Sequence, residues 1–495
     1  MAPILILLVI VIYFLVLLGI AWITGKKADN ESFFIGNRKS PWPVVAIGMV
    51  GASLSGVTFI SVPGWVIDSQ FSYLQMVMGY LVGYAVIAEI LLPLYYRMRL
   101  TSIYTYLDQR LGKSSYKTGA LFFLLSRTIG ASFRLFLVAN VLQITIFENW
   151  GVPFIVTVGI TLGLIWLYTN RGGIKTIIWT DLLQTVFMIS AVLLTVFLIT
   201  RSMDLSFGAM TDLIRENDLS RVFFFDDIND ERHFLKQFFA GMFITIVMTG
   251  LDQDMMQKNL SCKNIRDAKK NMYSYGIAFL PVNILFLSLG VLLVIFSNKI
   301  GLEISGSPDN LFPLVATQGN LGIAVALLFI LGLIAAAYSS ADSALTSLTT
   351  SFTVDILDVK QKSEDEIRSI RRSVHIGFSL LLMIVILIFR AVNDESVISA
   401  LFTVAGYTYG PLLGMFFFGL FTRRRIRDRV MPFIAIISPV LCFIIDRNSA
   451  FLFGGYKFGF ELLILNGLLT FSGMLIFSTR AGRDLFQGDL PGKVE

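Results

Sequence analysis

Long apolar stretches dominate the pattern of residues along the chain. Runs of about 20 mostly apolar residues recur from Pro3 to Ser478, and short polar segments separate them. A helix needs about 20 such residues to cross the hydrocarbon core of a membrane, so each run is long enough to span it. The runs lack the alternation of polar and apolar positions that is typical of barrel strands. The pattern therefore predicts an all-α polytopic membrane protein.

We expect about thirteen membrane spans. They cover residues 3–24, 42–67, 74–96, 118–147, 152–169, 177–200, 237–257, 271–298, 319–354, 373–389, 397–421, 430–446 and 458–479. The composition agrees, because 55% of the 495 residues are hydrophobic and only 15% are charged, whereas globular domains carry about 25% charged residues. A chain of soluble domains is therefore excluded.

The positive charges orient the chain. With the N-terminus outside, 29 of the 40 Lys and Arg residues fall in inner loops and the C-terminal tail, 9 fall in outer loops and 2 lie within spans. Short cytoplasmic loops attract positive charge, so we expect an outer N-terminus and a cytoplasmic C-terminus in the cell (inner) membrane. The same rule explains the net charge of +6, and no nucleic-acid partner is expected.

Ionisable residues within the spans indicate where function lies, because an unpaired charge at mid-membrane is costly. The bases are Arg127 and Arg134, and the clear acids are Glu89, Asp181 and Asp342. Arg127 is interpreted as a structural counter-ion of Glu89 or Asp181. Arg134 has no acid at its depth, which favours either an anionic ligand or a structural hydrogen-bonding role. Three acids against two bases leave about one negative charge, which a bound cation would cancel.

The ninth span carries a polar face. Ala336, Ser339, Ser340 and Ser343 share one side of the predicted helix, and Asp342 borders that side. Hydroxyls beside a carboxylate are hard oxygen ligands that suit an alkali cation. Packing of small residues would explain the alanines but not the carboxylate.

The second span has glycines and hydroxyls at its centre, from Gly48 to Thr58. One interpretation is a helix break, which frees carbonyls to bind a cation and turns half-helix ends towards a substrate. The other is close helix packing.

Taken together, these residues resemble the sodium:solute symporter family, which includes sodium-coupled glucose, proline and sialic acid transporters. The resemblance covers most of the chain. It rests on Arg171-Gly-Gly-Ile-Lys-Thr-Ile-Ile-Trp-Thr-Asp181-Leu-Leu-Gln184, Gly250-Leu-Asp-Gln253 with Gln257, Ala268-Lys269, Ala336 to Ser343, Gly406-Tyr-Thr-Tyr-Gly-Pro411 and Gly419-Leu-Phe-Thr-Arg423.

The resemblance implies a LeuT-type core of two five-helix repeats with inverted topology. The first repeat would cover 42–200 and the second 237–421, with a peripheral span at 1–24 and two further spans and a tail at 430–495. Such a protein is a transporter and not an enzyme.

The resemblance also implies ion ligands. One sodium site would use the carbonyls of Gly51, Leu54 and Ala336 with the hydroxyls of Ser339 and Ser340. A second, described for sialic acid transporters, would match Asp181, Ser339, Asp342 and Ser343. The resembling members carry serine in place of Asp342, so this extra carboxylate could tighten sodium, admit a proton or pair with Arg127.

Substrate positions are implied in the same way. They are Ser53, Ser55, Thr58, Gln75, Arg134 and Thr245. An arginine at the place of Arg134 meets the substrate carboxylate in the sialic acid branch, whereas Gln75 could equally cap its helix near the outer mouth.

We therefore expect a sodium-coupled secondary active symporter that imports a small carboxylate-bearing solute, such as a sialic acid or a sugar acid, by alternating access. The alternatives are a sodium-coupled carrier of a neutral sugar or polyol, a passive ion channel and a transporter-like sensor. The expected partners are the solute, sodium ions and the lipid bilayer, with the chain acting as a monomer.

Overall fold

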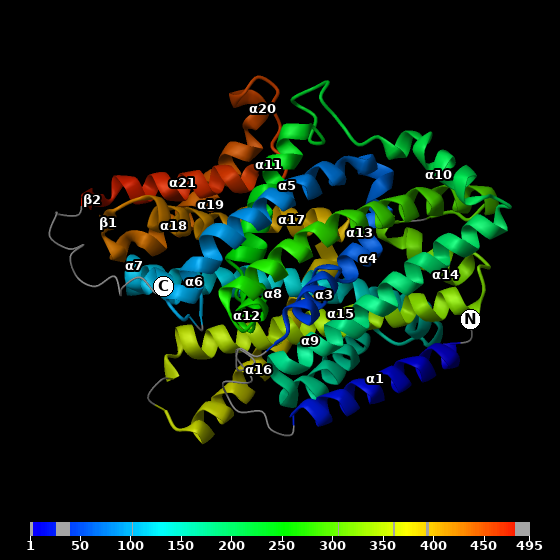
Figure 1. Cartoon of the computed structure of the whole chain (residues 1–495), viewed down its shortest axis with the longest axis horizontal. Coiled ribbons are helices and arrows are strands. Elements are labelled where there is room, and N and C mark those ends of the chain that lie inside the picture. The colour runs from blue at the N-terminus through cyan, green and yellow to red at the C-terminus, as the bar shows by residue number, and fades with distance from the viewer. Residues whose placement is uncertain are drawn as a thin grey trace.

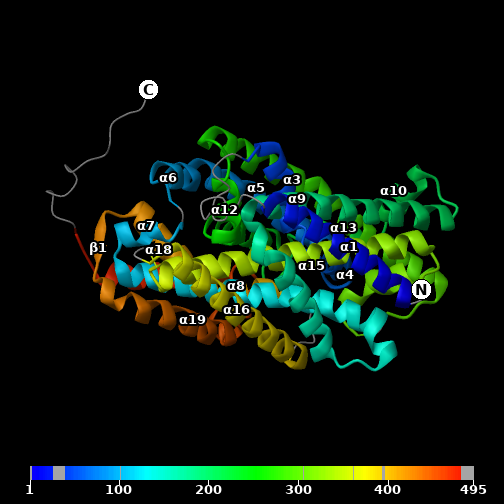
Figure 2. The same cartoon turned by 90° about the horizontal axis from the view of Figure 1, so that it is seen from below.

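The computed structural model describes residues 3–25, 40–100, 102–304, 306–359, 362–392 and 396–480. Figures 1 and 2 show a bundle of helices with a small two-stranded sheet near the C-terminal end. The helices are α1 (Pro3–Gly25), α3 (Trp42–Ser53), α4 (Gly56–Ser69), α5 (Tyr73–Val86), α6 (Leu92–Arg97), α7 (Thr105–Arg110), α8 (Lys113–Leu142), α9 (Phe154–Ser202), α10 (Phe207–Arg215), α11 (Phe234–Thr245), α12 (Gln253–Leu260), α13 (Ile265–Ile300), α14 (Leu311–Gln318), α15 (Ile323–Ser351), α16 (Glu364–Val392), α17 (Val397–Thr408), α18 (Gly410–Phe421), α19 (Met431–Arg447), α20 (Ser449–Leu452) and α21 (Leu462–Ile476). The strands are β1 (Arg424–Ile426) and β2 (Ser478–Arg480), which pair antiparallel.

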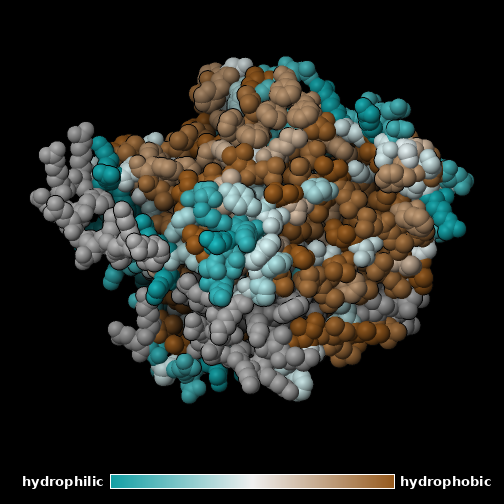
Figure 3. Space-filling model, in the orientation of Figure 1, coloured by the Kyte–Doolittle hydropathy of each residue, from teal (hydrophilic) through white to brown (hydrophobic). Residues whose placement is uncertain are grey.

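The helices have the length and surface of membrane spans. Among the described residues, six helical stretches are long and apolar enough to cross a membrane, and eight if each of two bent pairs is one span. Large apolar side chains face outwards, and Figure 3 shows apolar residues over much of the visible face. Lipid, unlike water, accepts such a surface without cost. The helical membrane fold is confirmed, and the number of thirteen spans stays a prediction.

The second predicted span is broken at its centre. α3 ends at Ser53 and α4 begins at Gly56. Leu54 and Ser55 between them leave the helical conformation, with ψ angles of 53° and 174°. Their geometry releases the last carbonyls of α3 from helical hydrogen bonds. The structure thus shows the helix break, and it shows close packing as well, because a Cβ on Gly51 would lie 2.0 Å from the Thr185 Oγ1 of α9.

The seventh predicted span is also broken, which the sequence did not indicate. α11 continues into a π-helical turn at Ile246–Gly250, and α12 then starts at Gln253 with a bend of 65°. Asp252 caps α12, because its side chain accepts the Asp254 backbone N–H at 2.9 Å. Such a cap replaces the helical hydrogen bonds lost at the break. The first span of each predicted repeat is therefore interrupted within the membrane.

A smaller bend divides the predicted span 397–421. α17 and α18 meet at 47° beside Tyr409. Pro411 lies in the first turn of α18, where a missing N–H costs least. The Gly-Tyr-Thr-Tyr-Gly-Pro motif therefore encodes this bend.

α9 contains two predicted spans in one helical run. The sequence predicted spans at 152–169 and 177–200 with a loop between them, but the described backbone is helical from Phe154 to Ser202. No proline occurs between them to stop the helical hydrogen bonds. The two halves still have different neighbours: Phe154 meets Arg390 of α16, whereas the later half contacts α3 and α15.

Two glycines let α5 and α11 approach each other closely. A Cβ on Gly79 would lie 2.0 Å from the Phe238 carbonyl oxygen, and one on Gly241 would lie 2.1 Å from that of Met76. Any larger residue would separate the backbones. This contact packs α11, the first part of the broken seventh span, against α5 of the third span.

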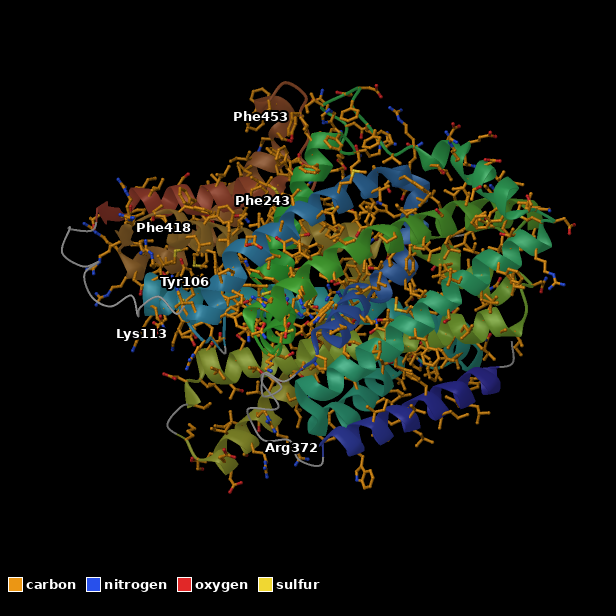
Figure 4. The ribbon with its side chains drawn as sticks, viewed as in Figure 1. Tyr106, Lys113, Phe243, Arg372, Phe418 and Phe453 are labelled. Atoms are coloured by element: carbon orange, nitrogen blue, oxygen red, sulfur yellow. The ribbon has the colours of Figure 1, made fainter. Side chains whose placement is uncertain are left out.

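The end of the molecule opposite the N-terminus is closed by polar contacts. Arg110 of α7 donates from Nε to the Gly419 carbonyl of α18 at 3.0 Å. Figure 4 shows Tyr106, Lys113 and Phe418 from α7, α8 and α18 together at this end. This hydrogen bond ties α7 to α18 at this end of the molecule.

Candidate functional site

A cavity of about 100 Å³ lies among α3, α4, α5, α8, α11, α12, α13 and α17, helices that are labelled in Figure 1. Its polar lining consists of hydroxyls and two guanidinium groups. These belong to Ser53, Ser55, Thr58, Tyr73, Tyr80, Tyr84, Arg127, Arg134, Thr245, Thr249 and Tyr275. The broken second and seventh spans both contribute, so the breaks place polar residues at one depth.

Most of the predicted substrate positions meet at this cavity. Ser53, Ser55 and Thr58 line it from the break between α3 and α4, and Thr245 lines it from the end of α11. The Ser53 hydroxyl also shares a hydrogen bond with the Tyr275 hydroxyl. The geometry brings these residues together, but their role in binding stays a prediction.

Gln75 does not line the cavity. Its side chain is fully buried, its Nε2 donates to the Arg232 carbonyl at 2.8 Å, and its Oε1 accepts the Phe224 N–H at 3.3 Å. It therefore ties α5 to the loop between α10 and α11. The structure supports neither the substrate role nor a helix cap, because both ends of the amide are bonded to loop backbone and no side chain caps α5.

Sequence reasoning missed the tyrosines of this site. Tyr73, Tyr80 and Tyr84 of α5 and Tyr275 of α13 face the cavity, and the Tyr84 hydroxyl donates to that of Tyr275 at 2.9 Å. The available signal was the occurrence of phenol hydroxyls inside otherwise apolar spans, since buried tyrosine needs a partner for its hydroxyl.

Arg134 faces the cavity without an ion-pair partner in the described part of the chain. Its Nε is buried and makes no hydrogen bond there. A guanidinium offers five donors in a rigid fork that matches a carboxylate. Asp252 and Asp254 act electrostatically on Arg134 but are held by Arg127 and Tyr409. The expectation that no acid lies at the depth of Arg134 stays a prediction.

The predicted partners of Arg127 were wrong. Arg127 of α8 forms an ion pair with Asp254 on α12, and its Nη1 lies 4.0 Å from Asp252. Ser343 of α15 donates to the other oxygen of Asp254, and Tyr409 donates to Asp252 at 2.8 Å. The break before α12 turns both aspartates inwards, and a span read as one helix could not show this.

Glu89 is not a deep acid. Its side chain is 53% exposed and pairs with Lys269 of α13 at 2.5 Å, and the Tyr273 hydroxyl donates to it at 3.0 Å. The helical run continues through Glu89 to Arg97, and Glu89 lies on the outer surface of the bundle and not among the buried charges.

Asp181 is paired with a lysine that the sequence placed in an inner loop. Lys258 on α12 lies with its Nζ 2.9 Å from Asp181 Oδ2, and the two side chains are 1% and 0% exposed. The count of two buried bases was therefore wrong. Among the described residues, Arg127 and Lys258 therefore pair with Asp254 and Asp181, and Asp309 and Asp355 are further buried acids.

The structure describes four of the five residues predicted as ligands of the first sodium site. The carbonyls of Gly51 and Leu54 point to one place, where Gln184 Nε2 donates to them at 2.9 and 3.2 Å. Ala336 is fully buried on α15. Ser340 is buried and its hydroxyl has no partner among the described residues.

The second predicted sodium site is only partly described. Asp181 contacts Lys258 and Ser343 contacts Asp254. The side chains of Ser339 and Asp342 lie outside the described residues. An ammonium group thus neutralises one of the expected ligands, and the second site stays a prediction.

A buried carboxylate lies next to the start of α17. Asp309, in the connection Pro308–Asn310 before α14, accepts the Val397 N–H of α17 at 2.9 Å. Burial raises the pKa of Asp309 from 3.8 to about 6, although this hydrogen bond favours the ionised form. The group links the connection before α14 to the start of α17.

Stability is expected to fall as the pH rises from about 4 to about 6. In this window the folded state binds more protons at Asp309 than the unfolded state, so the free energy of unfolding decreases by about 3 kcal/mol in total. Asp309→Asn should remove this dependence of stability on pH, whereas Asp212→Asn on exposed α10 should keep it. Unfolding temperatures measured in detergent between pH 4 and 8 check this, and an unchanged slope in Asp309→Asn contradicts it.

The profile described as Sodium:solute symporter family matches residues 33–428. The chain belongs to the sodium:solute symporter family. A member of this family couples solute movement to sodium in a membrane, and it is a transporter and not an enzyme.

Curated relatives of this symporter carry different solutes. The chain is 24% identical to the sodium/sialic acid symporter NanT of Aliivibrio fischeri over 91% of this chain and 89% of that protein. It is 24% identical to the sodium/sialic acid symporter SiaT of Proteus mirabilis over 92% of each. It is 27% identical to the human sodium/iodide cotransporter over 80% of this chain and 62% of that protein.

Solved structures confirm the fold of the symporter. A sodium-coupled sialic acid symporter in a substrate-bound outward-open state matches 95% of this chain and 97% of that chain, with a TM-score of 0.79 and 20% identity. The nucleobase-cation symporter Mhp1 matches 91% and 96%, with a TM-score of 0.54 and 17% identity. The expected LeuT-type core of inverted repeats is thereby confirmed. Its domain boundaries stay predictions.

Proposed function

We propose that this symporter imports a small organic anion, such as a sialic acid or a sugar acid, together with sodium. The observation that carries the proposal is Arg134, a guanidinium that faces the cavity and has no carboxylate partner in the described part of the chain. A buried cation without a partner is costly. A solute carboxylate would remove that cost through two parallel hydrogen bonds.

The curated relatives support an anionic solute. Sialic acid and iodide, named for three of them, are anions, and so is the solute named for the human sodium-coupled monocarboxylate transporter 2, which is 26% identical to this chain. The hydroxyls around Arg134 suit the polar groups of a sugar acid, since Ser, Thr and Tyr both donate and accept.

The size of the cavity indicates a conformational change during transport. Its volume of about 100 Å³ is smaller than the roughly 300–1,000 Å³ of pockets that hold drug-sized ligands. A sugar acid therefore binds when the lining helices move apart. The bends in the second, seventh and eleventh predicted spans are places where such movement can occur.

We place one sodium ion between α3 and α15. The carbonyls of Gly51, Leu54 and Ala336 and the hydroxyls of Ser339 and Ser340 would hold it. The unpartnered, buried Ser340 hydroxyl supports this, because buried polar atoms normally have a hydrogen-bond partner. Sodium at this position would bridge the two repeats and favour the outward-open state.

We also propose the cell membrane as the location, with the N-terminus outside, and a monomer as the transporting unit. The distribution of Lys and Arg among the loops supports the orientation.

Uptake into proteoliposomes tests the function. With an inward sodium gradient, a sialic acid or sugar acid should accumulate, and replacing sodium with choline or potassium should abolish accumulation. Neutral sugars and polyols belong in the same panel, because preferential uptake of one of these would favour the neutral-solute alternative over an anion carrier.

Ser340→Ala tests the ion site. Loss of one oxygen ligand is expected to raise the sodium concentration for half-maximal uptake by about tenfold or more, equivalent to about 1.4 kcal/mol. Ser347→Ala is the matched control, since Ser347 lies on the same helix and donates to the Ala344 carbonyl. Equal sodium dependence in both variants contradicts the site.

A further inference from the structure

Gln184 occupies the place where sodium is expected. The residue is fully buried on α9. Its Nε2 donates to the Gly51 carbonyl at 2.9 Å and to the Leu54 carbonyl at 3.2 Å. Both carbonyls belong to the break between α3 and α4, and both are proposed above as sodium ligands. One amide NH₂ group therefore donates to two oxygens that are both proposed sodium ligands.

The other end of this amide has no partner. Gln184 Oε1 is buried and makes no hydrogen bond among the described residues. The Ser340 hydroxyl is in the same condition. Buried acceptors without donors are rare in folded proteins, and such an oxygen is available to contact a water, an ion or a ligand. Two such oxygens now belong to the helices on either side of the proposed sodium position.

The register of α9 and α15 brings these oxygens together. A Cβ on Gly332 would lie 3.3 Å from the Met188 Cα, so the helices touch there. Further along, Asp181 of α9 contacts Lys258 of α12, and Ser343 of α15 contacts Asp254 of α12. Lys258 and Asp254 are one helical turn apart on α12. Residue numbers thus fall on α9 while they rise on α15, and the two helices run antiparallel.

This register sets the depth of Gln184. One helical turn inwards from the contact between Met188 and Gly332 lies Gln184 on one helix and Ala336 on the other. Ser340 follows one turn deeper. The amide of Gln184 is therefore level with Ala336, whose carbonyl is a proposed sodium ligand.

We infer that Gln184 is a further sodium ligand, and that its amide exchanges ends when the ion binds. Without sodium, the NH₂ group donates to the Gly51 and Leu54 carbonyls and keeps them converged. With sodium, rotation of the terminal amide presents Oε1 to the ion beside the same carbonyls. This inference rests on the proposed sodium site and adds a residue that the resemblance did not supply.

The chemistry of the amide explains why it suits both states. A glutamine carries a donor and an acceptor on one planar group, so a half-turn exchanges them. Three carbonyl-type oxygens facing one another repel unless a cation lies between them, whereas hard oxygen ligands are what an alkali ion prefers. The NH₂ group thus holds the empty site in shape, and Oε1 completes the occupied one.

Two substitutions separate the roles of the two ends. Gln184→Leu keeps similar bulk and removes both, so the sodium concentration for half-maximal thermal stabilisation should rise about tenfold. Gln184→Glu can only accept when ionised, so it should give a larger rise in unfolding temperature on adding sodium than the wild type does. Gln143→Leu is the control, because Gln143 binds the Val152 carbonyl near the end of α8.

The measurement is the unfolding temperature of purified protein in detergent at pH 8, without solute, as sodium chloride replaces choline chloride at constant ionic strength. If Gln184→Leu binds sodium as tightly as the wild type, or more tightly, the amide is no ligand and the inference is overturned. Should that variant fail to fold, an unchanged or smaller sodium response in Gln184→Glu overturns it.

Failure of the inference is distinct from failure of the proposed site. A wild-type protein that sodium stabilises, together with a Gln184→Leu variant that responds in the same way, removes only the role of Gln184. A wild-type protein without any sodium response overturns the proposed sodium site, and the role of Gln184 with it.

Discussion

Arg134→Gln is expected to reduce uptake of a carboxylate solute by about 100-fold or more, because two charge-assisted hydrogen bonds are worth roughly 3 kcal/mol or more. Glutamine keeps a polar side chain but loses the charge and the fork. The helices that line the cavity should keep their positions, since Arg134 makes no ion pair in the described part of the chain.

Uptake into proteoliposomes under a fixed sodium gradient checks this result. Arg215→Gln, on the exposed face of α10, is the matched control and should transport normally. The sodium concentration for half-maximal uptake should change little in Arg134→Gln, because the loss lies in solute binding. Normal carboxylate uptake by this variant would contradict the anion assignment and favour a neutral sugar or polyol.

Lys258→Met is expected to destabilise the protein by about 3–5 kcal/mol, the usual cost of removing one partner of a buried ion pair. Lys258 and Asp181 lie 2.9 Å apart, and neither side chain is exposed by more than 1%. Without the ammonium group, the Asp181 carboxylate loses its neutralising charge in a low-dielectric interior. Methionine preserves the apolar stem, so the loss measures charge more than packing.

A double variant separates the charge from other effects. Lys258→Met with Asp181→Asn should be more stable than Lys258→Met alone, because no uncompensated charge remains. Denaturant unfolding in detergent, compared with Lys269→Met at the half-exposed pair with Glu89, gives the measurement. A loss below about 1 kcal/mol for Lys258→Met, as expected of surface pairs, would contradict the role of this ion pair.

Features that depend on local composition were predictable. The break at Leu54 and Ser55 followed from glycines and hydroxyls at the middle of an apolar run, and the absence of an ion pair at Arg134 among the described residues agrees with its depth. Both are properties of one span, because hydropathy sets depth in the membrane and Gly-rich sequence weakens a helix where it occurs.

Features that depend on partners were not predictable. Arg127 binds Asp254, which is 127 positions away in sequence, and Lys258 was counted in a loop although it is fully buried. Counting along an apolar run gives a depth but not a rotation, so it cannot say which acid faces which base. The break before α12 was missed for a related reason, since polar residues at a span end also fit a loop.

The sequence by itself therefore determined the membrane setting, the family and the approximate depth of the functional residues, because each span must satisfy the bilayer on its own. Only the tertiary structure decided the pairing of buried charges, the removal of Gln75 from the cavity and the position of Gln184 against the Gly51 and Leu54 carbonyls. These depend on how helices from distant parts of the chain are rotated and broken against one another, and the free energy that selects this arrangement is shared among all of them.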